Sequence, residues 1–339
     1  MNVILIIDGG TTNLRVHLLN ADTLAVIDSR KTDGGVRCTA MDGNNMRLKT
    51  LLRDTINELL DRHTLSRASV TDCIAYGMIT SGMGLVEIPH VPAPASQDDL
   101  ARYMVTRSFP DVCPFPIRFI PGVRNFAEAV NLSNCAAMDM MRGEETESIG
   151  LYQLLHPCRD ALFVLPGSHN KFVHMRSDGT ILGCMTSISG ELLDSITHHT
   201  ILSDAVGHTF LPAESYSPDL VRAGAAECVR SGLGRAAFAG RILKTLGGQD
   251  TAAIQNWILG AVLAEDVKAM DSFTKGQHIQ IYIAGKSPLQ SAFLDVLTEV
   301  SSCAAEPVAA ADAGQMGILG ALTISGIIRE GNSRLGSST

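Results

Sequence analysis

A glycine-rich turn close to the N-terminus has the composition of a phosphate-binding loop. It reads DGGTTN over residues 8–13 and follows the apolar run MNVILII. Glycines let backbone N–H groups approach an anion, and successive N–H groups in a turn can surround it. The threonines and the asparagine add side-chain donors, Arg15 adds positive charge, and Asp8 can hold Mg²⁺ directly or through water. Neither of the phosphate-binding motifs GxxxxGK[ST] and GxGxxG is present. The alternative interpretation is therefore an ordinary hairpin turn with an exposed aspartate.

A second turn, PGSHNK at residues 166–171, offers similar donors. Gly10 and Gly167 are each followed by a hydroxyl residue and, three positions on, by an asparagine. Lys171 is either a cation for phosphate or carboxylate or a solvated strand residue, and His169 receives no proton-transfer role. Two interpretations of the repeat stay open. Either two hairpins share turn chemistry by coincidence, or the chain holds duplicated α/β domains whose equivalent hairpins face one cleft.

Three glutamates gather in the segment MRGEETE at residues 141–147, ahead of an apolar helix. Acidic side chains stabilise the positive end of a helix dipole, which is one explanation for them. The other explanation is a general base for a substrate hydroxyl, a role that typically accelerates a reaction by about 10²–10⁴-fold.

The composition argues against several kinds of partner. The chain has 339 residues, is 45% hydrophobic and carries a net charge of −8, which disfavours nucleic acids and anionic membranes. Aromatic residues make up only 5%, with one tryptophan, so a platform for stacking bases is not expected. No apolar stretch has the length of a membrane span, and no basic segment precedes the N-terminal apolar run. We expect a soluble cytoplasmic protein with small-molecule substrates.

The eight cysteines are scattered and form no CxxC pair. In a long chain with a large core, this pattern predicts free, mostly buried thiols in a reducing compartment.

Apolar periodicity predicts the elements that position these segments. Strands are expected at Val3–Ile7, Leu14–Leu19, Ala25–Ser29, Cys73–Tyr76, Ile117–Ile120, Ala161–Leu165, Lys171–Met175 and Ile279–Ala284. Helices are expected at 46–63, 97–107, 145–156, 189–199, 219–231, 234–246, 251–272, 288–299 and 315–329. Ser96 and Asp99 have the spacing of a capping box, and the polar tail from residue 331 is expected to be flexible.

Taken together, these segments resemble the 2-dehydro-3-deoxygalactonokinases, within the acetate and sugar kinase, heat-shock cognate and actin superfamily. The matching segments are IIDGGTTNLR at 6–15, GMITS at 77–81, PHVPAPA at 89–95, PGV at 121–123, MMRGEET at 140–146, LPGSHNKFV at 165–173, SGELL at 189–193 and IAGKSPL at 283–289. MRGEET and PGSHNKFV are the specific ones, since DGGTT alone indicates only the superfamily.

The resemblance implies an α/β fold of two ribonuclease-H-like domains, each a mixed β-sheet flanked by helices, with an interdomain cleft. Residues 1–157 would form the N-terminal domain with the phosphate-1 hairpin and sugar-binding loops. Residues 158–330 would form the C-terminal domain with the phosphate-2 hairpin and the adenosine site, and 331–339 a flexible tail. The implied activity is ATP- and Mg²⁺-dependent phosphorylation of the terminal 6-hydroxyl of 2-dehydro-3-deoxy-D-galactonate in galactonate catabolism.

The resemblance also implies roles for single residues. Glu144 is the candidate base, and Asp8 the candidate ligand of Mg²⁺. The residues expected to bind ATP are Gly10, Thr11, Thr12, Asn13, Gly167, Ser168, His169, Lys171, Gly285, Lys286 and Ser287. Those expected to bind the sugar acid are Arg15, Thr80, Ser81, Arg142 and Glu145, and Glu145 is also the alternative base.

The sequence departs from the family pattern at three places. Gly9 and Phe172 stand where the family usually has tryptophan, and residues 80–85 read TSGMGL in place of an arginine or polar residue followed by tryptophan. We expect these changes on the sugar side of the cleft. Three alternatives therefore stay open: a kinase for another sugar or sugar acid, a non-catalytic nucleotide-binding regulator, and a polymerising or chaperone-like ATPase. The sequence leaves a homodimer open.

Overall fold

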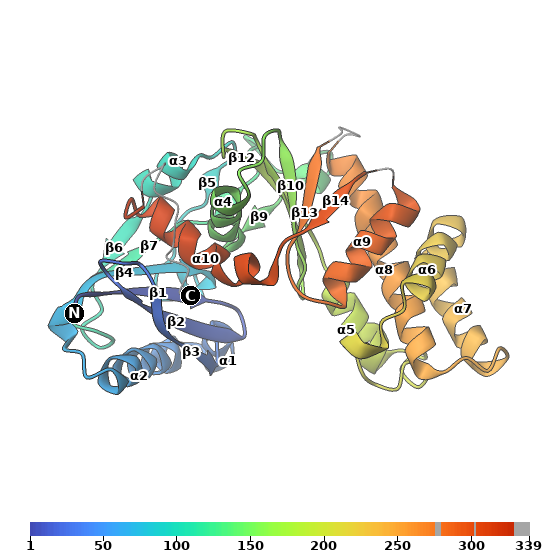
Figure 1. Ribbon diagram of the computed structural model, residues 1–339, viewed down its shortest axis with the longest axis horizontal. Helices are drawn as coiled ribbons and strands as arrows, with labels where there is room; N and C mark the ends of the chain where they lie inside the picture. Colours follow the sequence, from blue (N-terminus) through green and yellow to red (C-terminus); the bar gives the residue numbers. More distant parts are fainter. Residues whose placement is uncertain (275–278, 302, 329–339) are drawn as a thin grey trace. The chain divides into compact units, whose positions relative to one another are not determined.

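The structure is a computed structural model that describes residues 1–274, 279–301 and 303–328. The chain divides into two compact units, each built of mixed β-sheet and helices (Figure 1). Unit 1 comprises Met1–His156, Asp178–Gly183 and the chain from Gly314 on, and unit 2 comprises Pro157–Ser177 and Cys184–Ala313. The predicted tail, residues 331–339, lies outside the described residues.

This division differs from the predicted domain limits of 1–157 and 158–330. The first junction lies one residue earlier, between His156 and Pro157, but the last helix, α10 (Ala310–Ile324), belongs to unit 1 from Gly314 on. The reason is packing, because α10 lies against helix α4 (Glu144–Leu155) so closely that the Met316 carbonyl leaves no room for a side chain on Gly150.

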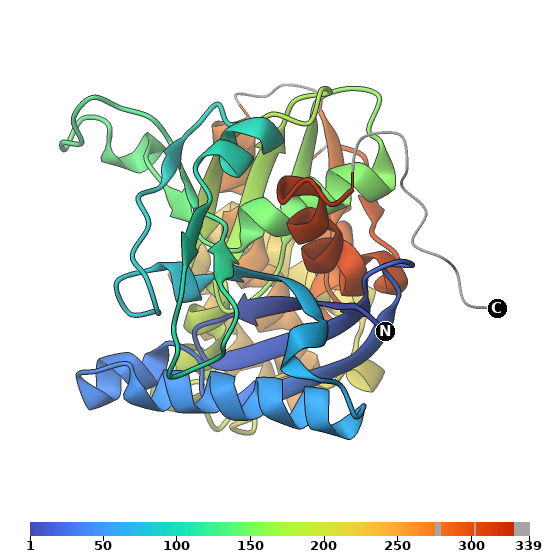
Figure 2. The ribbon, with the colours of Figure 1, turned by 90° about the vertical axis from the view of Figure 1, so that its left-hand side faces the viewer.

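Unit 1 is built on a six-stranded sheet with the order β3-β2-β1-β4-β7-β6. The strands are β1 (Val3–Gly9), β2 (Asn13–Asn20), β3 (Val26–Asp33), β4 (Val70–Gly77), β6 (Val105–Arg107) and β7 (Ile117–Phe119). Strand β1 pairs antiparallel with β2 and parallel with β4. Helix α2 (Met46–Arg62) covers one face, and α4 and α10 lie on the other (Figures 1 and 2). Strand β1 is therefore buried on both faces, which explains the unbroken apolar run of Val3–Ile7.

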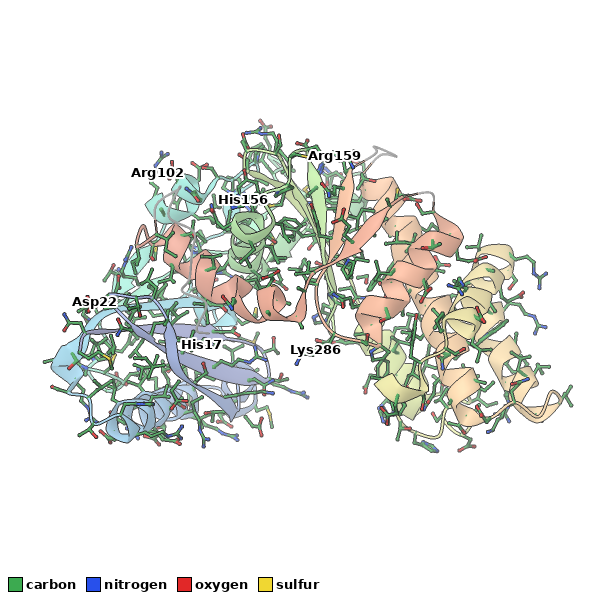
Figure 3. All side chains as sticks on the ribbon, viewed as in Figure 1. His17, Asp22, Arg102, His156, Arg159 and Lys286 are labelled. Atoms are coloured by element: carbon green, nitrogen blue, oxygen red, sulfur yellow. The ribbon has the colours of Figure 1, made fainter. Side chains whose placement is uncertain are left out.

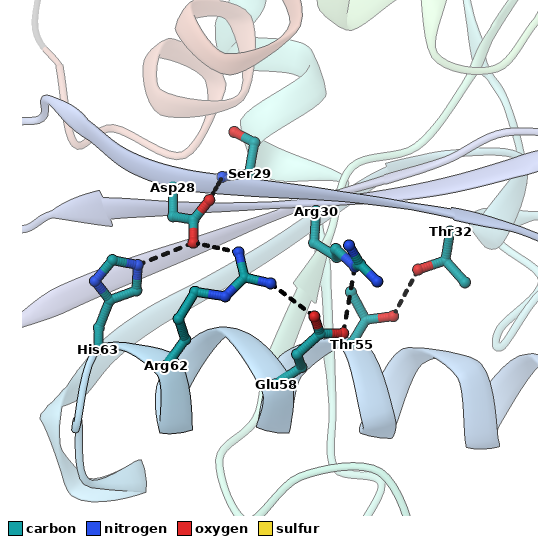
Figure 4. A network of polar contacts seen from close by, with 8 residues as sticks. All are labelled: Asp28, Ser29, Arg30, Thr32, Thr55, Glu58, Arg62 and His63. Atoms are coloured by element: carbon teal, nitrogen blue, oxygen red, sulfur yellow. Dashed lines mark hydrogen bonds and ion pairs between the residues drawn. The ribbon is translucent and has the colours of Figure 1, made fainter.

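A polar network fixes the C-terminal end of α2 to strand β3 (Figure 4). Arg62 contacts Asp28 at 2.9 Å and Glu58 at 2.7 Å, and His63 contacts the same Asp28 oxygen at 2.9 Å. The hydrogen bonds from His63, Ser29 and Arg62 lower the pKa of Asp28. Together with the apolar face of α2, this network holds the helix under the strands that carry the first turn.

Smaller elements complete unit 1. They are α1 (Arg37–Asp42), α3 (Gln97–Arg102) and a three-stranded sheet of β5 (Val91–Pro92), β8 (Val123–Arg124) and β9 (Met140–Met141). The predicted capping box of Ser96 and Asp99 is confirmed. The helix that it starts ends at Arg102, before the predicted residue 107, because the chain there pairs as β6 with β7.

Unit 2 contains a five-stranded sheet with the order β12-β11-β10-β13-β14. Its strands are β10 (Ala161–Leu165), β11 (Asn170–Met175), β12 (Ile181–Ser187), β13 (Gln280–Ile283) and β14 (Ala305–Pro307). Its helices are α5 (Ser189–His199), α6 (Pro218–Ser231), α7 (Leu233–Thr245), α8 (Thr251–Phe273) and α9 (Leu289–Val300). Apolar side chains of β10, β11 and β13 form one core with these helices.

Most of the expected strands and helices are confirmed within a few residues. The sequence analysis missed α1, β12 and β14, and it placed the last helix at 315–329, whereas α10 ends at Ile324. Residue 329 lies outside the described part of the chain. All eight cysteines are free, as expected.

Among the described residues, no helix is both long and apolar enough to cross a membrane.

Candidate functional site

The first turn, residues 10–12, is held by its backbone carbonyl groups. These three carbonyls accept hydrogen bonds of 2.9–3.1 Å from the N–H groups of residues 34, 36 and 37, and Gly10 donates to the Asn13 carbonyl at 2.9 Å. Within the described residues, the N–H groups of Thr11 and Thr12 have no hydrogen-bond partner. The turn therefore keeps its acceptors occupied and its donors free, which suits an anion.

The segment that follows strand β3 packs against the first turn and needs glycine at position 35. A Cβ built on Gly35 would lie 2.1 Å from the Gly10 carbonyl oxygen, far inside van der Waals contact. The first turn is thus shaped by a neighbouring backbone segment that approaches it without a side chain.

Asp8 and Arg15 face each other across the antiparallel pair of β1 and β2. Their side chains form an ion pair of 2.9 Å, with the aspartate 18% exposed and the arginine 48% exposed. No group of three or more His, Cys, Asp or Glu residues in the described part of the chain could hold a metal ion. Mg²⁺ usually keeps several waters and takes one or two carboxylates plus substrate phosphates, so Asp8 suits it as a single ligand.

Glu145 is fully buried at the start of α4. The Gly143 N–H donates to both of its carboxylate oxygens, at 3.0 and 2.8 Å, and the Thr146 hydroxyl donates to one of them at 3.0 Å. Burial, together with the neighbouring carboxylate of Glu144, raises the pKa of Glu145 to about 8. A carboxyl so enclosed fixes the backbone at Gly143 and does not present itself to a substrate.

Glu144 differs from Glu145 because its side chain is only partly buried. One of its oxygens accepts from the Arg142 N–H at 3.1 Å. Of the two candidate bases, Glu144 is the one that a substrate hydroxyl could reach.

The sequence analysis did not single out Glu147 as a site residue. Burial and the carboxylates of Asp8, Glu144 and Glu145 raise the pKa of Glu147. The spacing of three residues from Glu144 on one helix face is the signal that could have found it.

Arg142 is positioned differently from the expectation that it binds a sugar carboxylate. Its guanidinium donates to the Thr80 carbonyl (2.7 Å), the Thr80 hydroxyl (2.9 Å) and the Ile88 carbonyl (2.5 Å). Thr80 is fully buried, and the Ser81 hydroxyl donates to the Met78 carbonyl at 2.7 Å. We therefore assign Arg142 and Thr80 to holding the 78–90 loop, because their polar groups are already engaged.

The second turn is held by a buried side chain. The Gly167 N–H donates to the Asn170 Oδ1 at 3.0 Å, and the Asn170 Nδ2 donates to the Oδ2 of Asp266 on α8 at 2.7 Å. The Glu191 N–H donates to the Ser168 carbonyl at 3.0 Å, which joins the turn to the start of α5. The sequence analysis missed Asp266, which lies 96 residues from Asn170 and matches no motif.

One residue of the second turn, Lys171, is not placed as expected. Lys171 is 5% exposed, and its ammonium donates to the Thr186 hydroxyl, so its side chain is not a solvent-facing cation for ATP. The reason is that β11 is an interior strand, between β10 and β12. His169 is exposed and lies 3.0 Å from the Glu191 carboxylate.

A pocket of about 270 Å³ borders the second turn. It is lined mainly by Gly167 and Ser168 of the turn, Leu193 and Thr197 of α5, Phe210, and Leu289 at the start of α9. The pocket thus has an apolar wall of Leu193, Phe210 and Leu289 and ends at the backbone of the second turn, and the apolar wall suits a ligand with an apolar ring.

The loop at residues 285–287 lies beside the same turn. A Cβ on Gly285 would lie 3.5 Å from the ring of Pro166, an ordinary contact distance. Lys286 is exposed and extends away from the ribbon (Figure 3), and the Ser287 and Ser291 hydroxyls are 2.5 Å apart. Unit 2 therefore brings together the expected phosphate-2 turn, the pocket and the expected adenosine loop.

A family model described as 2-keto-3-deoxy-galactonokinase matches residues 8–321. The chain belongs to this family. A curated relative of Rhizobium meliloti (strain 1021), named "Probable 2-dehydro-3-deoxygalactonokinase DgoK1", is 28% identical over 219 residues, which are 63% of this chain and 63% of that protein. The alignment therefore spans less than two thirds of the relative.

A solved structure supports the fold of this family member. The crystal structure of a candidate 2-dehydro-3-deoxygalactonokinase from Sinorhizobium meliloti has a TM-score of 0.75 and 21% identity. The match covers 94% of this chain and 98% of that one. The expected two-domain α/β fold is therefore confirmed. The expectation that both turns face one cleft stays a prediction.

Two of the departures from the usual pattern of the galactonokinase family have a structural explanation. A Cβ on Gly9 would lie 2.5 Å from the Cβ of Ile79, so this position leaves no room for tryptophan. Phe172 is fully buried and packs edge-on against Phe293 of α9, with ring centroids 6.1 Å apart. The prediction that Phe172 lies on the sugar side was wrong, because its side chain belongs to the core of unit 2.

Proposed function

We propose that the chain is an ATP-dependent sugar-acid kinase that phosphorylates the 6-hydroxyl of 2-dehydro-3-deoxy-D-galactonate. The observation that carries the proposal is the family match over residues 8–321, which includes both turns and the three glutamates of α4. We place the enzyme in the cytoplasm, in galactonate catabolism, with ATP and the sugar acid as its partners. The oligomeric state is left to measurement.

We assign the phosphates of ATP to the two turns. In the first, the unpartnered N–H groups of Thr11 and Thr12 support this role, and in the second the backbone around Gly167 and Ser168 borders the pocket. The apolar wall of Phe210 and Leu289 would take the adenine ring. Backbone donors set in a fixed turn stabilise the transferred phosphoryl group because they need no reorganisation during the reaction.

The carboxylates of unit 1 supply the acid–base chemistry in this proposal. Glu144 accepts the proton of the sugar 6-hydroxyl, while Glu145 fixes Gly143 and so the direction of the Glu144 side chain. Arg15 is assigned to the sugar carboxylate, because its side chain is 48% exposed and its ion pair with Asp8 uses only Nη1, whereas both terminal nitrogens of Arg142 are engaged by the 78–90 loop. Mg²⁺, when bound, would neutralise phosphate charge, and Asp8 would be its carboxylate ligand.

The proposal is tested by an assay of the purified full chain with ATP, Mg²⁺ and a panel of sugar acids. ADP formation is followed by a coupled reaction and the product by mass spectrometry. We expect the highest kcat/KM for 2-dehydro-3-deoxy-D-galactonate, with phosphate on the 6-oxygen. If only another sugar acid were phosphorylated, the proposed substrate would be wrong and that sugar acid would replace it. ATP binding without turnover of any sugar acid would favour a nucleotide-binding regulator.

Replacing Asp8 tests the metal assignment. We expect Asp8→Ala to lose most Mg²⁺-dependent turnover and to need a higher Mg²⁺ concentration for half-maximal rate. Asp22→Ala is the control, because Asp22 is an exposed aspartate of the same unit, in the turn after β2 (Figure 3). An unchanged Mg²⁺ titration for Asp8→Ala would remove Asp8 from the metal site.

A further inference from the structure

A single buried carboxylate connects the segments that border the pocket of unit 2. Asp266 lies in the middle of α8 and is 2% exposed. Its Oδ2 accepts from the Asn170 Nδ2 at 2.7 Å, and its Oδ1 accepts from the Ser189 hydroxyl at 2.6 Å. Asn170 belongs to the second turn and Ser189 begins α5, so both oxygens of one side chain are used to join two separate segments.

The contact continues from Asp266 to the backbone of the turn. Asn170 is 1% exposed, and its Oδ1 accepts from the Gly167 N–H at 3.0 Å. The orientation of the Asn170 amide is fixed by Asp266, since only an acceptor can receive its Nδ2. Asp266 thereby determines that Asn170 presents oxygen, and not nitrogen, to Gly167.

The other side of the carboxylate sets the position of α5. The Ser187 hydroxyl donates to the Ser189 oxygen at 3.1 Å, and the Ser189 hydroxyl in turn donates to Asp266. The next residue, Gly190, lies so close to the turn that an added Cβ would be 2.3 Å from the Gly167 carbonyl oxygen. The turn and the helix start therefore have one relative position, and both line the pocket.

Burying a carboxylate costs free energy unless hydrogen bonds compensate for the lost hydration. Burial raises the pKa of Asp266, while the hydrogen bonds from Ser189, Asn170 and Ser187 act in the opposite direction. An amide in the same place would be easier to bury, but it would turn a donor toward either Asn170 or Ser189. A carboxylate accepts from Asn170 and from Ser189 at the same time, whereas an amide has one oxygen and can accept from only one of them.

We propose that Asp266 is a positioning residue of the nucleotide site, which acts through Asn170 and Ser189 to fix the phosphate-binding turn against α5. The inference rests on the proposed function, because the site that it organises is the ATP site assigned there. Asp266 itself does not touch the nucleotide in this role.

The first test is Asp266→Asn, with ADP affinity measured by calorimetry on the full chain. The new amide has one acceptor where the carboxylate has two, so when its oxygen keeps the bond from Ser189, Asn170 turns over and no longer accepts from Gly167. We expect the dissociation constant of ADP to rise about tenfold or more, as the loss of one well-placed hydrogen bond predicts. KM for ATP should rise similarly, while KM for the sugar acid should not change.

The matched control is Asn256→Asp on the same helix. Asn256 is 1% exposed, its Oδ1 accepts from the Ser217 N–H at 2.8 Å, and its Nδ2 donates to the Ser215 carbonyl at 2.9 Å. This variant also exchanges an amide and a carboxylate in a buried network of α8, but away from the turn. We expect lower thermal stability with the ADP affinity of the wild type.

The second test exchanges the two side chains. The double variant carries Asn170→Asp and Asp266→Asn. The amide at position 266 then donates to the carboxylate at position 170, and its oxygen still accepts from Ser189. The carboxylate at position 170 still accepts from the Gly167 N–H. We expect slow hydrogen exchange at the Gly167 amide in the wild type and in the double variant, and fast exchange in Asp266→Asn alone. A general loss of stability would not be repaired by this exchange.

Two results would overturn the inference. One is an Asp266→Asn variant that binds ADP as the wild type does, and the other is a Gly167 amide that stays protected in it. Wild-type protein that binds no ADP would instead defeat the proposed function. The exchange rate at Gly167 would still decide, without any nucleotide, whether Asp266 fixes the turn.

Discussion

The two glycine-rich turns share a sequence pattern but are stabilised in different ways. In the first, the carbonyls of residues 10–12 are bound by a neighbouring backbone segment, and within the part of the chain that the structure describes the Asn13 side chain hydrogen-bonds only to the exposed Thr12 hydroxyl, at 3.0 Å. In the second, the equivalent Asn170 is buried and forms the link between Gly167 and Asp266. The same spacing of glycine and asparagine thus serves a backbone-supported turn in one unit and a side-chain-supported turn in the other.

The chemistry around the turns also differs. Asp8 precedes Gly10 by two residues, and the glutamates of α4 lie near it, whereas the position two residues before Gly167 holds the apolar Leu165. Unit 1 therefore supplies the carboxylates, while the second turn borders an apolar pocket. This division predicts that substitutions in the two units will change different kinetic constants.

The largest effect is expected for Glu144→Gln. Loss of the base should lower kcat by about 10²–10⁴-fold, while ADP, which in our proposal contacts the two turns and the pocket of unit 2 but not Glu144, should keep its affinity. Steady-state kinetics and calorimetry measure the two quantities. Glu128→Gln, at an exposed glutamate of the same unit, serves as the control. Near-normal turnover in Glu144→Gln would show that the carboxylate chemistry lies elsewhere.

The next effect concerns the two asparagines directly. Asn170→Ala removes the acceptor of the Gly167 N–H and the donor to the Oδ2 of the buried Asp266, so we expect a loss of about 2–4 kcal/mol in the free energy of unfolding. Asn13→Ala removes only an exposed contact and should cost less than about 0.5 kcal/mol. Denaturant unfolding of both variants gives the comparison. Equal losses would contradict the distinction between a backbone-supported and a side-chain-supported turn.

The sequence predicted the turns themselves but not what holds them. Both follow apolar strands, and their glycines, hydroxyl residues and asparagines are local signals, so the two hairpins and their order could be found. Gly35 and Asp266 could not, because each acts across the fold on a segment remote in sequence, and neither belongs to a motif. The burial of single charged side chains could not be predicted from the sequence either. Lys171 and Arg142 have the charge of anion-binding residues, but their side chains are engaged by Thr186 and by the 78–90 loop.

Two alanine substitutions, Gly35→Ala and Gly190→Ala, test the close backbone contacts of the first and of the second turn. An alanine Cβ at Gly35 would lie 2.1 Å from the Gly10 oxygen, and one at Gly190 would lie 2.3 Å from the Gly167 oxygen. Because backbone atoms must move in both cases, each variant should lose about 1–3 kcal/mol of stability. Gly190→Ala should in addition weaken ADP binding, since its contact lines the pocket. Gly232→Ala is not a suitable control because of its positive φ, but Gly234→Ala is, since nothing lies near its Cβ.

The last prediction tests the buried carboxyl of Glu145 in unit 1 through the pH dependence of stability. Glu145 has a folded pKa of about 8, above its usual 4.5, so between about pH 5 and 8 the folded state keeps a proton that the unfolded state has lost. The stability that this proton contributes is complete below about pH 4.5 and is lost as the pH rises toward 8. We expect Glu145→Gln, which does not titrate, to flatten the fall in thermal unfolding midpoint over this window. Glu128→Gln should follow the wild type. If the unfolding midpoint of Glu145→Gln ran parallel to that of the wild type over this pH range, the Glu145 carboxyl would be ionised in the folded protein. Its hydrogen bonds from Gly143 would then be made by a charged group, like those of Asp266 from its donors.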